Sequence, residues 1–221
     1  MPFLLLILVL LLPTQQTDNS QMSLAERAAA ATKKKDAGVQ LTLEQRGAVV
    51  KGKYVNDVLQ FEVTPPKGWE IYSEGHMNTS ETLGKMYLNI HSAVHGSSHR
   101  VLGLGDGTGQ NIYISIQPIP ADAPEGQDVD KIVSTARKRV HQEIPSGRDA
   151  QETLLLGDAS HKFAAFRYTY LVQGRPIVQS LQLTVINGFA LSFTMTGHTD
   201  ADLSSVVRLL LQNLTWKNSK P

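Results

Sequence analysis

Apolar and polar residues alternate with a period of two along much of this chain, and in three places apolar residues repeat with helical spacing. The alternation predicts strands at residues 58–63, 69–72, 100–104, 111–117, 151–156, 163–172, 177–186 and 189–196. Apolar stripes every three or four residues predict helices at residues 78–94, 128–143 and 199–213. Short turns between successive strands favour antiparallel pairing. The expected fold class is therefore α+β, an antiparallel sheet layered with helices.

The strands at residues 177–186 and 189–196 show the clearest alternation, and Asn187-Gly188 between them is typical of a two-residue hairpin turn. We expect one face of this hairpin to belong to the core and the other to be wet or lightly covered. The expected apolar face comprises Leu181, Leu183, Val185, Phe189, Leu191, Phe193 and Met195. The expected polar face comprises Ser180, Gln182, Thr184, Ser192, Thr194 and Thr196. The closing helix should bury its stripe on the apolar face, with Leu183, Phe193, Val207 and Leu210 in one cluster.

The N-terminus carries an unbroken apolar run of ten residues, Phe3–Leu12. At ~1.5 Å per residue it is too short to cross a hydrocarbon core of ~30 Å, and its length fits the apolar region of a secretory signal. No Lys or Arg precedes it, so a weak retained anchor and a buried segment of the fold are alternatives. We expect a signal-like leader at residues 1–19, an exposed, partly helical arm or linker at residues 20–53, and a single α+β domain at residues 54–217.

Composition excludes several classes of function. The 221 residues are enough for one domain with a substantial core. The net charge is +1, so no global field draws the chain to nucleic acid or to an anionic membrane. The absence of cysteine excludes disulfides, thiolate metal sites, iron–sulfur clusters and a thiol nucleophile. We expect no nucleic-acid partner, no stable membrane span in the mature chain, and a monomer.

Histidines are the best candidates for a metal site. His91 and His95 are four residues apart, which places both imidazoles on one face of a helix, the spacing that zinc needs. A third ligand would have to come from His76 or His99. However, Gly96 should end the helix before His99, and no Glu follows His91. The simpler interpretation is a polar flank of the helix, and we assign no metal ligand.

Two further patterns have simple structural explanations. Glycines alternate at Gly103, Gly105, Gly107 and Gly109, but a strand follows them where a phosphate-binding loop needs a helix, so we expect a hairpin loop. The oxygens of Asp106, Thr108 and Gln110 would make a weak calcium site with one carboxylate. A basic strip of Lys131, Arg137, Lys138 and Arg139 has no interleaved aromatic residue for base stacking, so we expect a solvated helix face.

No pattern selects a catalytic residue or a cofactor-binding residue. The Gly-x-Ser-x-Gly elbow of many serine hydrolases does not occur, and nothing selects a Ser–His–Asp set. Asn78-Thr79-Ser80 and Asn213-Leu214-Thr215 fit the glycosylation acceptor pattern, and we expect neither to be used.

A family resemblance enters at the start of the expected domain. The residues that carry it are Tyr54, Asn56, Leu59, Phe61, Pro65-Pro66 and Gly68-Trp69, with Asn213-Leu214-Thr215-Trp216 at the end. This opening and the order of elements up to Trp216 resemble PsbP-like domains, also described as the Mog-type fold. The resemblance implies an antiparallel sheet sandwiched by helices, an α-β-α arrangement. It also implies an exported bacterial protein of a superfamily whose members mostly bind partners and do not catalyse.

The function that follows from this sequence is a non-catalytic exported binding or scaffold domain, whose partner is a protein or another component of the cell envelope. An alternative is a carrier of a small molecule or metal ion that uses the cleft between sheet and helices. A less favoured alternative is an unrecognised hydrolase. We expect no cofactor, and we expect a periplasmic or extracellular location through the signal-like segment.

Overall fold

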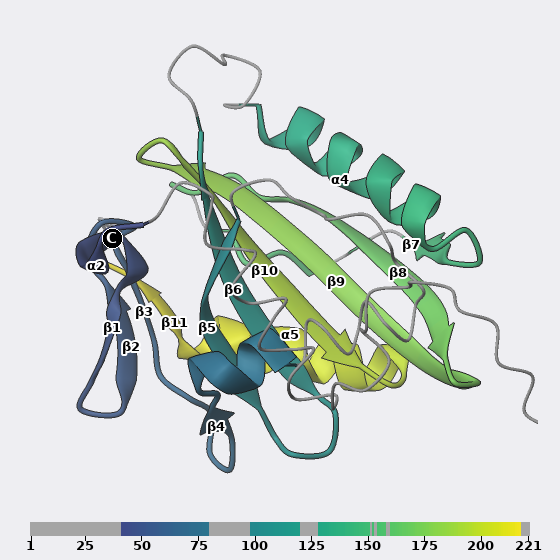
Figure 1. Cartoon of the computed structure of the whole chain (residues 1–221), viewed down its shortest axis with the longest axis horizontal. Coiled ribbons are helices and arrows are strands. Elements are labelled where there is room, and N and C mark those ends of the chain that lie inside the picture. Colours follow the sequence, from purple (N-terminus) through teal and green to yellow (C-terminus); the bar gives the residue numbers. More distant parts are fainter. Residues whose placement is uncertain are drawn as a thin grey trace, which may run out of the picture.

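The computed structural model describes residues 41–79, 98–119, 128–150, 152, 154–157 and 160–217. The strands of these residues form two sheets, and every strand pair is antiparallel (Figure 1). The smaller sheet has the order β1 (Ala48–Val50), β2 (Lys53–Asn56), β3 (Phe61–Val63) and β11 (Leu214–Trp216). The larger sheet has the order β4 (Glu70–Ile71), β5 (His99–Gly105), β6 (Asn111–Pro118), β10 (Phe189–Gly197), β9 (Arg175–Ile186), β8 (Ala164–Val172) and β7 (Arg148–Ala150). The expected α+β fold class is confirmed.

Two long helices cover opposite faces of the larger sheet (Figure 1). α5 (Asp200–Asn213) packs on β10 and β9, while α4 (Val129–Glu143) packs on β8 and β9. The core on the α5 side includes Ile112, Ile114, Ile116, Leu191, Phe193, Met195, Leu203, Val206, Val207 and Leu210. The core on the α4 side comprises Val129, Val133, Ile144, Phe166, Tyr168, Tyr170 and Leu183. This is the α-β-α layering that the sequence resemblance implies.

Local signals explain where both helices begin. The side chain of Asp128 accepts hydrogen bonds from two backbone amides in the first turn of α4. Thr199 and Asp202 form a capping box at the start of α5, in which each side chain bonds to the backbone of the other residue. Both predicted helices are confirmed, as are the predicted strands that correspond to β5, β6, β8, β9 and β10.

Both expected faces of the β9–β10 hairpin, the apolar one and the polar one, are wrong. Ser180, Gln182 and Thr184 lie opposite Met195, Phe193 and Leu191 and are buried. The two-residue turn pairs Ile186 with Phe189, so each odd-numbered residue of β9 lies opposite an even-numbered residue of β10. Residues directly opposite each other in an antiparallel pair share a face. Leu183, opposite Ser192, therefore lies in the core under α4, whereas Phe193, opposite Gln182, lies in the core under α5. Of the predicted cluster, Phe193, Val207 and Leu210 share one core, whereas Leu183 belongs to the other.

The strand expected at residues 151–156 is also wrong. The described part of this segment contains no strand, and β7 precedes it at residues 148–150. The reason is that Gln182 of β9 takes the place of a neighbouring strand. Its side-chain amide bonds to the carbonyl of Leu154 at 2.8 Å and to the N–H of Leu156 at 2.8 Å. The carbonyl of Leu154 and the N–H of Leu156 are thus bonded to a side chain and not to a backbone ladder.

The domain extends further toward the N-terminus than the expected boundary at Tyr54. Leu41 belongs to the main core, and α2 (Leu43–Arg46) and β1 follow it directly. β1 pairs with β2 through the turn Lys51-Gly52, whose residues have φ angles of 50° and 78°. Residues 41–53 are therefore part of the packed fold and not of an arm. The leader at residues 1–19 and the rest of the arm lie outside the described residues.

Two other predicted elements differ at their ends. The strand expected from residue 58 begins only at Phe61, because residues 57–60 form a turn in which Gln60 has a φ of 57°. Residues 74–79 are already helical, so the helix expected at 78–94 starts earlier, and the rest of it lies outside the described residues. Among the described residues, none of the helices combines the length and the apolar composition that a bilayer span requires.

Candidate functional site

The candidate metal ligands are only partly described. The ring of His76 stacks on that of Tyr72, with the ring centroids 4.1 Å apart, and His99 begins β5. His91 and His95 lie outside the described residues. Within the described ranges, no three His, Asp or Glu side chains are grouped closely enough to hold a metal ion.

The hairpin loop expected in the glycine-rich segment spans residues 106–110, whereas Gly103 and Gly105 lie in β5. The carboxylate of Asp106 accepts hydrogen bonds from the N–H of Thr108 at 2.8 Å, from its hydroxyl at 2.6 Å and from the N–H of Gln110 at 3.2 Å. Burial alone would raise the pKa of Asp106, but these hydrogen bonds lower it overall. The carboxylate closes the turn. Gly105 has a separate role, because a Cβ there would lie 1.5 Å from the hydroxyl oxygen of Tyr72.

The basic strip on α4 is partly engaged in ion pairs. Arg137 and His141 both contact the carboxylate of Asp149 on β7, His141 at 2.8 Å. Arg139 lies 3.8 Å from Glu143 of the same helix. These contacts attach α4 to the edge of the larger sheet. Asn213 of the second glycosylation pattern has a contact within the fold, since its side-chain amide donates to the carbonyl of Leu209 at 2.7 Å.

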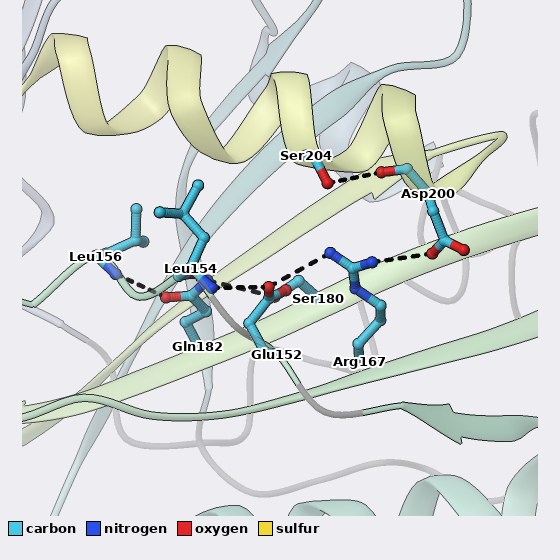
Figure 2. Close-up of polar contacts among 8 residues, drawn as sticks. All are labelled: Glu152, Leu154, Leu156, Arg167, Ser180, Gln182, Asp200 and Ser204. Atoms are coloured by element: carbon cyan, nitrogen blue, oxygen red, sulfur yellow. Dashed lines mark hydrogen bonds and ion pairs between the residues drawn. The ribbon is translucent and has the colours of Figure 1, made fainter.

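A polar cluster lies between the larger sheet and the start of α5 (Figure 2). At its centre, the guanidinium of Arg167 on β8 reaches two carboxylates. Nη2 of Arg167 lies 3.4 Å from Oε1 of Glu152, and Nη1 lies 2.9 Å from Oδ1 of Asp200. The side chain of Glu152 is 0% exposed and that of Arg167 is 13% exposed. Arg167 therefore joins three parts of the fold: β8, the segment around residue 152 and the first turn of α5.

The hydroxyl groups of the same cluster form no nucleophile–base pair. Oγ of Ser180 accepts a hydrogen bond from Nε2 of Gln182 at 3.4 Å. Oγ of Ser204 donates to the backbone carbonyl of Asp200 at 2.8 Å. Activation of a serine requires a side-chain base within hydrogen-bonding distance, and neither contact provides one. The contacts of the cluster attach Glu152 to β8 and attach Leu154 and Leu156 to Gln182 of β9.

A different kind of surface lies at one end of the molecule, where α2, β1 and β2 meet (Figure 1). A cavity of about 450 Å³ opens between these elements and the turn after β2. We name this surface the N-terminal edge, formed by Leu43, Glu44, Val49, Val50, Val55, Asp57 and Val58. Leu43 is 85% exposed, Val49 52% and Val50 51%. It therefore combines a hollow with large apolar side chains in water, which is typical of interaction sites.

Two buried side chains fix the shape of this edge. The hydroxyl of Tyr54 donates to the carbonyl of Arg46 at 2.7 Å, and the amide of Asn56 donates to the carbonyl of Gln45 at 3.0 Å. Burial raises the pKa of Tyr54 to about 12 although a hydrogen bond from Asn56 acts in the opposite direction, so the hydroxyl keeps its proton and can donate. Gly47 allows the close approach, because a Cβ there would lie 2.7 Å from the hydroxyl oxygen of Tyr54. These bonds satisfy the last carbonyls of α2 and hold it on β2.

The N-terminal edge was not predicted, because Leu43, Glu44, Val49 and Val50 fall in the expected arm at residues 20–53. A local signal was present. Ala48-Val49-Val50 and Tyr54-Val55 are short runs rich in β-formers on either side of Lys51-Gly52, which is a hairpin pattern. The exposure of Leu43 and the cavity depend on how α2 folds back on β2, which no local pattern indicates.

No protein-family model matches this chain, and no curated protein matches its sequence. Among solved structures, it is similar to cyanobacterial PsbP (CyanoP) from Synechocystis sp. PCC 6803, with 13% identity, a TM-score of 0.46, and coverage of 82% of this chain and 99% of that chain. It is also similar to LpqN of Mycobacterium tuberculosis, involved in cell envelope biogenesis, with 13% identity, a TM-score of 0.43, and coverage of 71% and 83%. A structure from Bacteroides thetaiotaomicron VPI-5482 has 12% identity, a TM-score of 0.38, and coverage of 76% and 49%. At these identities and TM-scores, neither activity nor partners transfer to this chain.

Proposed function

We propose that this protein is a non-catalytic, exported binding domain that holds a protein partner at its N-terminal edge. The observation that carries the proposal is the exposed apolar surface around the cavity: Leu43, Val49 and Val50 are all more than half exposed beside a preformed hollow. Keeping such side chains in water costs free energy, which a partner would recover by covering them.

The polar cluster under α5 supports the non-catalytic part of the proposal. Its most buried groups, Glu152, Arg167 and Gln182, bond to one another or to nearby backbone, and these contacts attach one segment of the fold to another. A catalytic acid or base has to be within reach of a substrate. The side chain of Glu152 is 0% exposed beneath α5, which supports a role out of reach of a substrate.

Export is the second part of the proposal, and it rests on the apolar run Phe3–Leu12. The mature protein would lack this leader and function outside the cytoplasm, where a partner of the cell envelope is available. N-terminal sequencing of the protein from its native cells tests this part. A native chain that still begins at Met1 would contradict cleavage and favour the weak anchor.

The binding proposal is tested with matched surface variants of the whole chain. The fluorescently labelled protein is titrated with envelope proteins extracted from its native cells. We expect saturable binding that Leu43→Glu weakens about tenfold or more, because it places a charge at the centre of the apolar surface. Leu171 is a fitting control, since it is 62% exposed on β8, and Leu171→Glu should leave binding unchanged.

Two results would contradict the binding proposal. One is the absence of saturable binding by the unmodified chain. The other is an equal loss with Leu43→Glu and Leu171→Glu, which would indicate nonspecific adhesion of exposed apolar side chains. The circular dichroism and melting temperature of both variants have to match those of the unmodified chain, so that a loss of binding is not a loss of fold.

A further inference from the structure

The hairpin that borders the N-terminal edge leaves one backbone unit facing outward. The Lys51-Gly52 turn has two positive φ angles, 50° and 78°, as in the tight turns that close a two-residue hairpin. In such a hairpin the residues that flank the turn, Val50 and Lys53, form a hydrogen-bonded pair, and the next such pair is Ala48 with Val55. The N–H and C=O of Val49, between these pairs, must point away from β2.

This outward unit lies on an open edge of the smaller sheet. Among the described residues, β1 pairs with β2 and with no other strand. All three residues of β1 are exposed. An edge strand with free backbone groups and exposed β-branched side chains is a template for a further strand. Natural edges are often protected by Lys or Pro, whereas β1 presents Ala-Val-Val.

The cavity next to β1 adds a side-chain pocket to this edge. Its apolar lining includes Leu43, Val50, Val55 and Val58, and its two carboxylates are Glu44 and Asp57. Asp57 already has a cationic partner, because Nζ of Lys217 lies 2.5 Å from its Oδ1. No cation of the described residues forms an ion pair with Glu44. A ligand that fits this pocket is therefore apolar, with a positive charge to one side.

Hydrogen bonds within the fold hold the N-terminal edge in shape without a ligand. Tyr54 and Asn56 hold α2 against β2 through two hydrogen bonds to its last carbonyls. The side chain of Asn56 also accepts from the N–H of Leu59 at 2.9 Å, which fixes the turn that forms one wall of the cavity. A rigid edge reduces the entropy that binding must overcome.

We propose that the N-terminal edge binds an extended peptide segment of a partner protein, which adds to β1 as a further strand. The backbone of the peptide pairs with the N–H and C=O of Val49, one apolar side chain enters the cavity, and a Lys or Arg beside it faces Glu44. Strand addition of this kind derives affinity from backbone bonds and specificity from alternate side chains. This inference rests on the proposed function and specifies the class of partner and its mode of binding.

The test uses the full chain and synthetic peptides of eight residues as probes. The peptides alternate apolar and polar positions and carry one terminal lysine, and a second set carries glutamate in its place. We expect the best lysine peptides to bind with a Kd on the order of 10–100 μM, since the edge is short. Binding should slow the hydrogen exchange of the Val49 amide, whereas the amides of Val50 and Lys53 are already bonded within the hairpin.

Matched variants separate backbone pairing from general contact. Val49→Pro removes the outward N–H, and a proline is tolerated on a strand edge that faces solvent. We expect it to weaken peptide binding about tenfold, while the control Val49→Thr retains the N–H and binds within about twofold. Glu44→Lys should weaken the lysine peptides and strengthen the glutamate peptides. Such a reversal requires a direct charge contact, which loss of fold cannot imitate.

Several outcomes would overturn the inference. No binding by any peptide would do so, as would equal binding by Val49→Pro and Val49→Thr. A dimer in light scattering that Val49→Pro dissociates would assign the edge to a second copy of the chain. A zero-length cross-link between Glu44 and Lys33, Lys34 or Lys35 of the same molecule would assign it to the chain itself. If Val49→Pro still binds envelope proteins as well as the unmodified chain, strand addition is wrong and the proposed function stands. If the unmodified chain binds neither peptides nor envelope proteins, both are wrong.

Discussion

Tyr54, Asn56 and Gln182 are buried polar residues whose side chains bond to backbone groups that no helix or strand satisfies. Tyr54 and Asn56 join β2 to α2, and Gln182 joins β9 to the segment at Leu154. Tyr54 and Asn56 are among the residues that carry the family resemblance, yet their role could not be inferred from the sequence, because the carbonyls that they bind belong to α2. Gln182 was expected on a wet or lightly covered face. It is instead fully buried opposite Phe193 on the α5 side, where its amide substitutes for a strand.

Removing the bonds that hold α2 should destabilise the whole fold. Asn56→Ala leaves the carbonyl of Gln45 and the N–H of Leu59 without their partner, and Asn56 is fully buried. An unsatisfied buried polar group costs ~1–3 kcal/mol, so we expect a loss of this size in the free energy of unfolding, measured by urea denaturation. Ser205→Ala on the exposed side of α5 is the control and should stay within ~0.5 kcal/mol. Equal stability of Asn56→Ala and the unmodified chain would contradict the assigned role.

The acid sensitivity of the α4 contact follows from Asp149. Burial would raise the pKa of this carboxyl, but hydrogen bonds from His141 and Arg137 outweigh burial and leave the pKa below its usual value. A lowered pKa in the folded state means that the contribution to stability is complete above the unfolded pKa of ~3.9 and is lost as pH falls through the folded pKa. Asp149→Asn should therefore flatten the loss of stability on acidification, measured as the free energy of unfolding against pH below ~5. An unchanged slope would show that Asp149 is not coupled to folding.

At the scale of elements, the predictions succeeded where a signal is local and failed where it depends on a partner. The starts of α4 and α5 follow from caps and stripes within a few residues. The strand expected at residues 151–156 failed because Gln182, far away in the sequence, provides the bonds of a strand. The wrong face expected for Leu183 has a different cause. The two-residue turn at Asn187-Gly188 already determines that odd-numbered residues of β9 lie opposite even-numbered residues of β10. This register could have been derived from the sequence. The expected apolar face was wrong because it placed odd-numbered residues of both strands on one side.

The corrected register makes a prediction about coupling between core residues. Phe193→Ala should cost ~3–5 kcal/mol and Leu183→Ala ~2–5 kcal/mol, since each empties part of a core. Because the two side chains lie on opposite faces of the sheet, their effects should add to within ~0.5 kcal/mol. Phe193→Ala and Leu210→Ala change the same core and should deviate from additivity by more than this. The double-mutant cycles are measured by denaturant unfolding. Strong coupling between Leu183 and Phe193 would indicate that both side chains lie on the same face of the sheet, against the observed register.

Removing only the guanidinium of the ion pair under α5 should destabilise the fold more than removing both charges. Arg167→Met leaves Glu152 buried without its guanidinium, and breaking a buried pair in this way typically costs ~3–5 kcal/mol. Adding Glu152→Gln to that variant removes the stranded charge and should recover a large part of the loss. The free energies of unfolding of the single and double variants decide the matter. A double variant that is less stable than Arg167→Met alone would indicate that Glu152 stabilises the fold independently of Arg167.

At the scale of the whole molecule, one core joins the two sheets. Phe61 of the smaller sheet lies with its ring centroid 6.1 Å from that of Phe193 in the larger sheet and 5.7 Å from that of Trp216. Leu41, which precedes α2, belongs to the same core. The N-terminal edge is therefore part of a single cooperative unit. Residues from both ends of the described chain meet at its cavity, since Nζ of Lys217 lies 2.5 Å from Oδ1 of Asp57 in the cavity wall.

Shortening the chain from its N-terminus tests how far this unit extends. A chain that begins at Leu41 keeps every described contact, so we expect its melting temperature within a few degrees of that of the full chain. A chain that begins at Lys51 lacks Leu41, α2 and β1. Loss of the buried Leu41 alone removes ~2–5 kcal/mol, and in a domain of this size each kcal/mol corresponds to ~2–4 °C. We therefore expect scanning calorimetry to show a drop of about 10 °C or more for the second chain. Equal melting temperatures for the two shortened chains would mean that α2 and β1 fold separately from the core, and the rigid edge inferred for peptide binding would lose its basis.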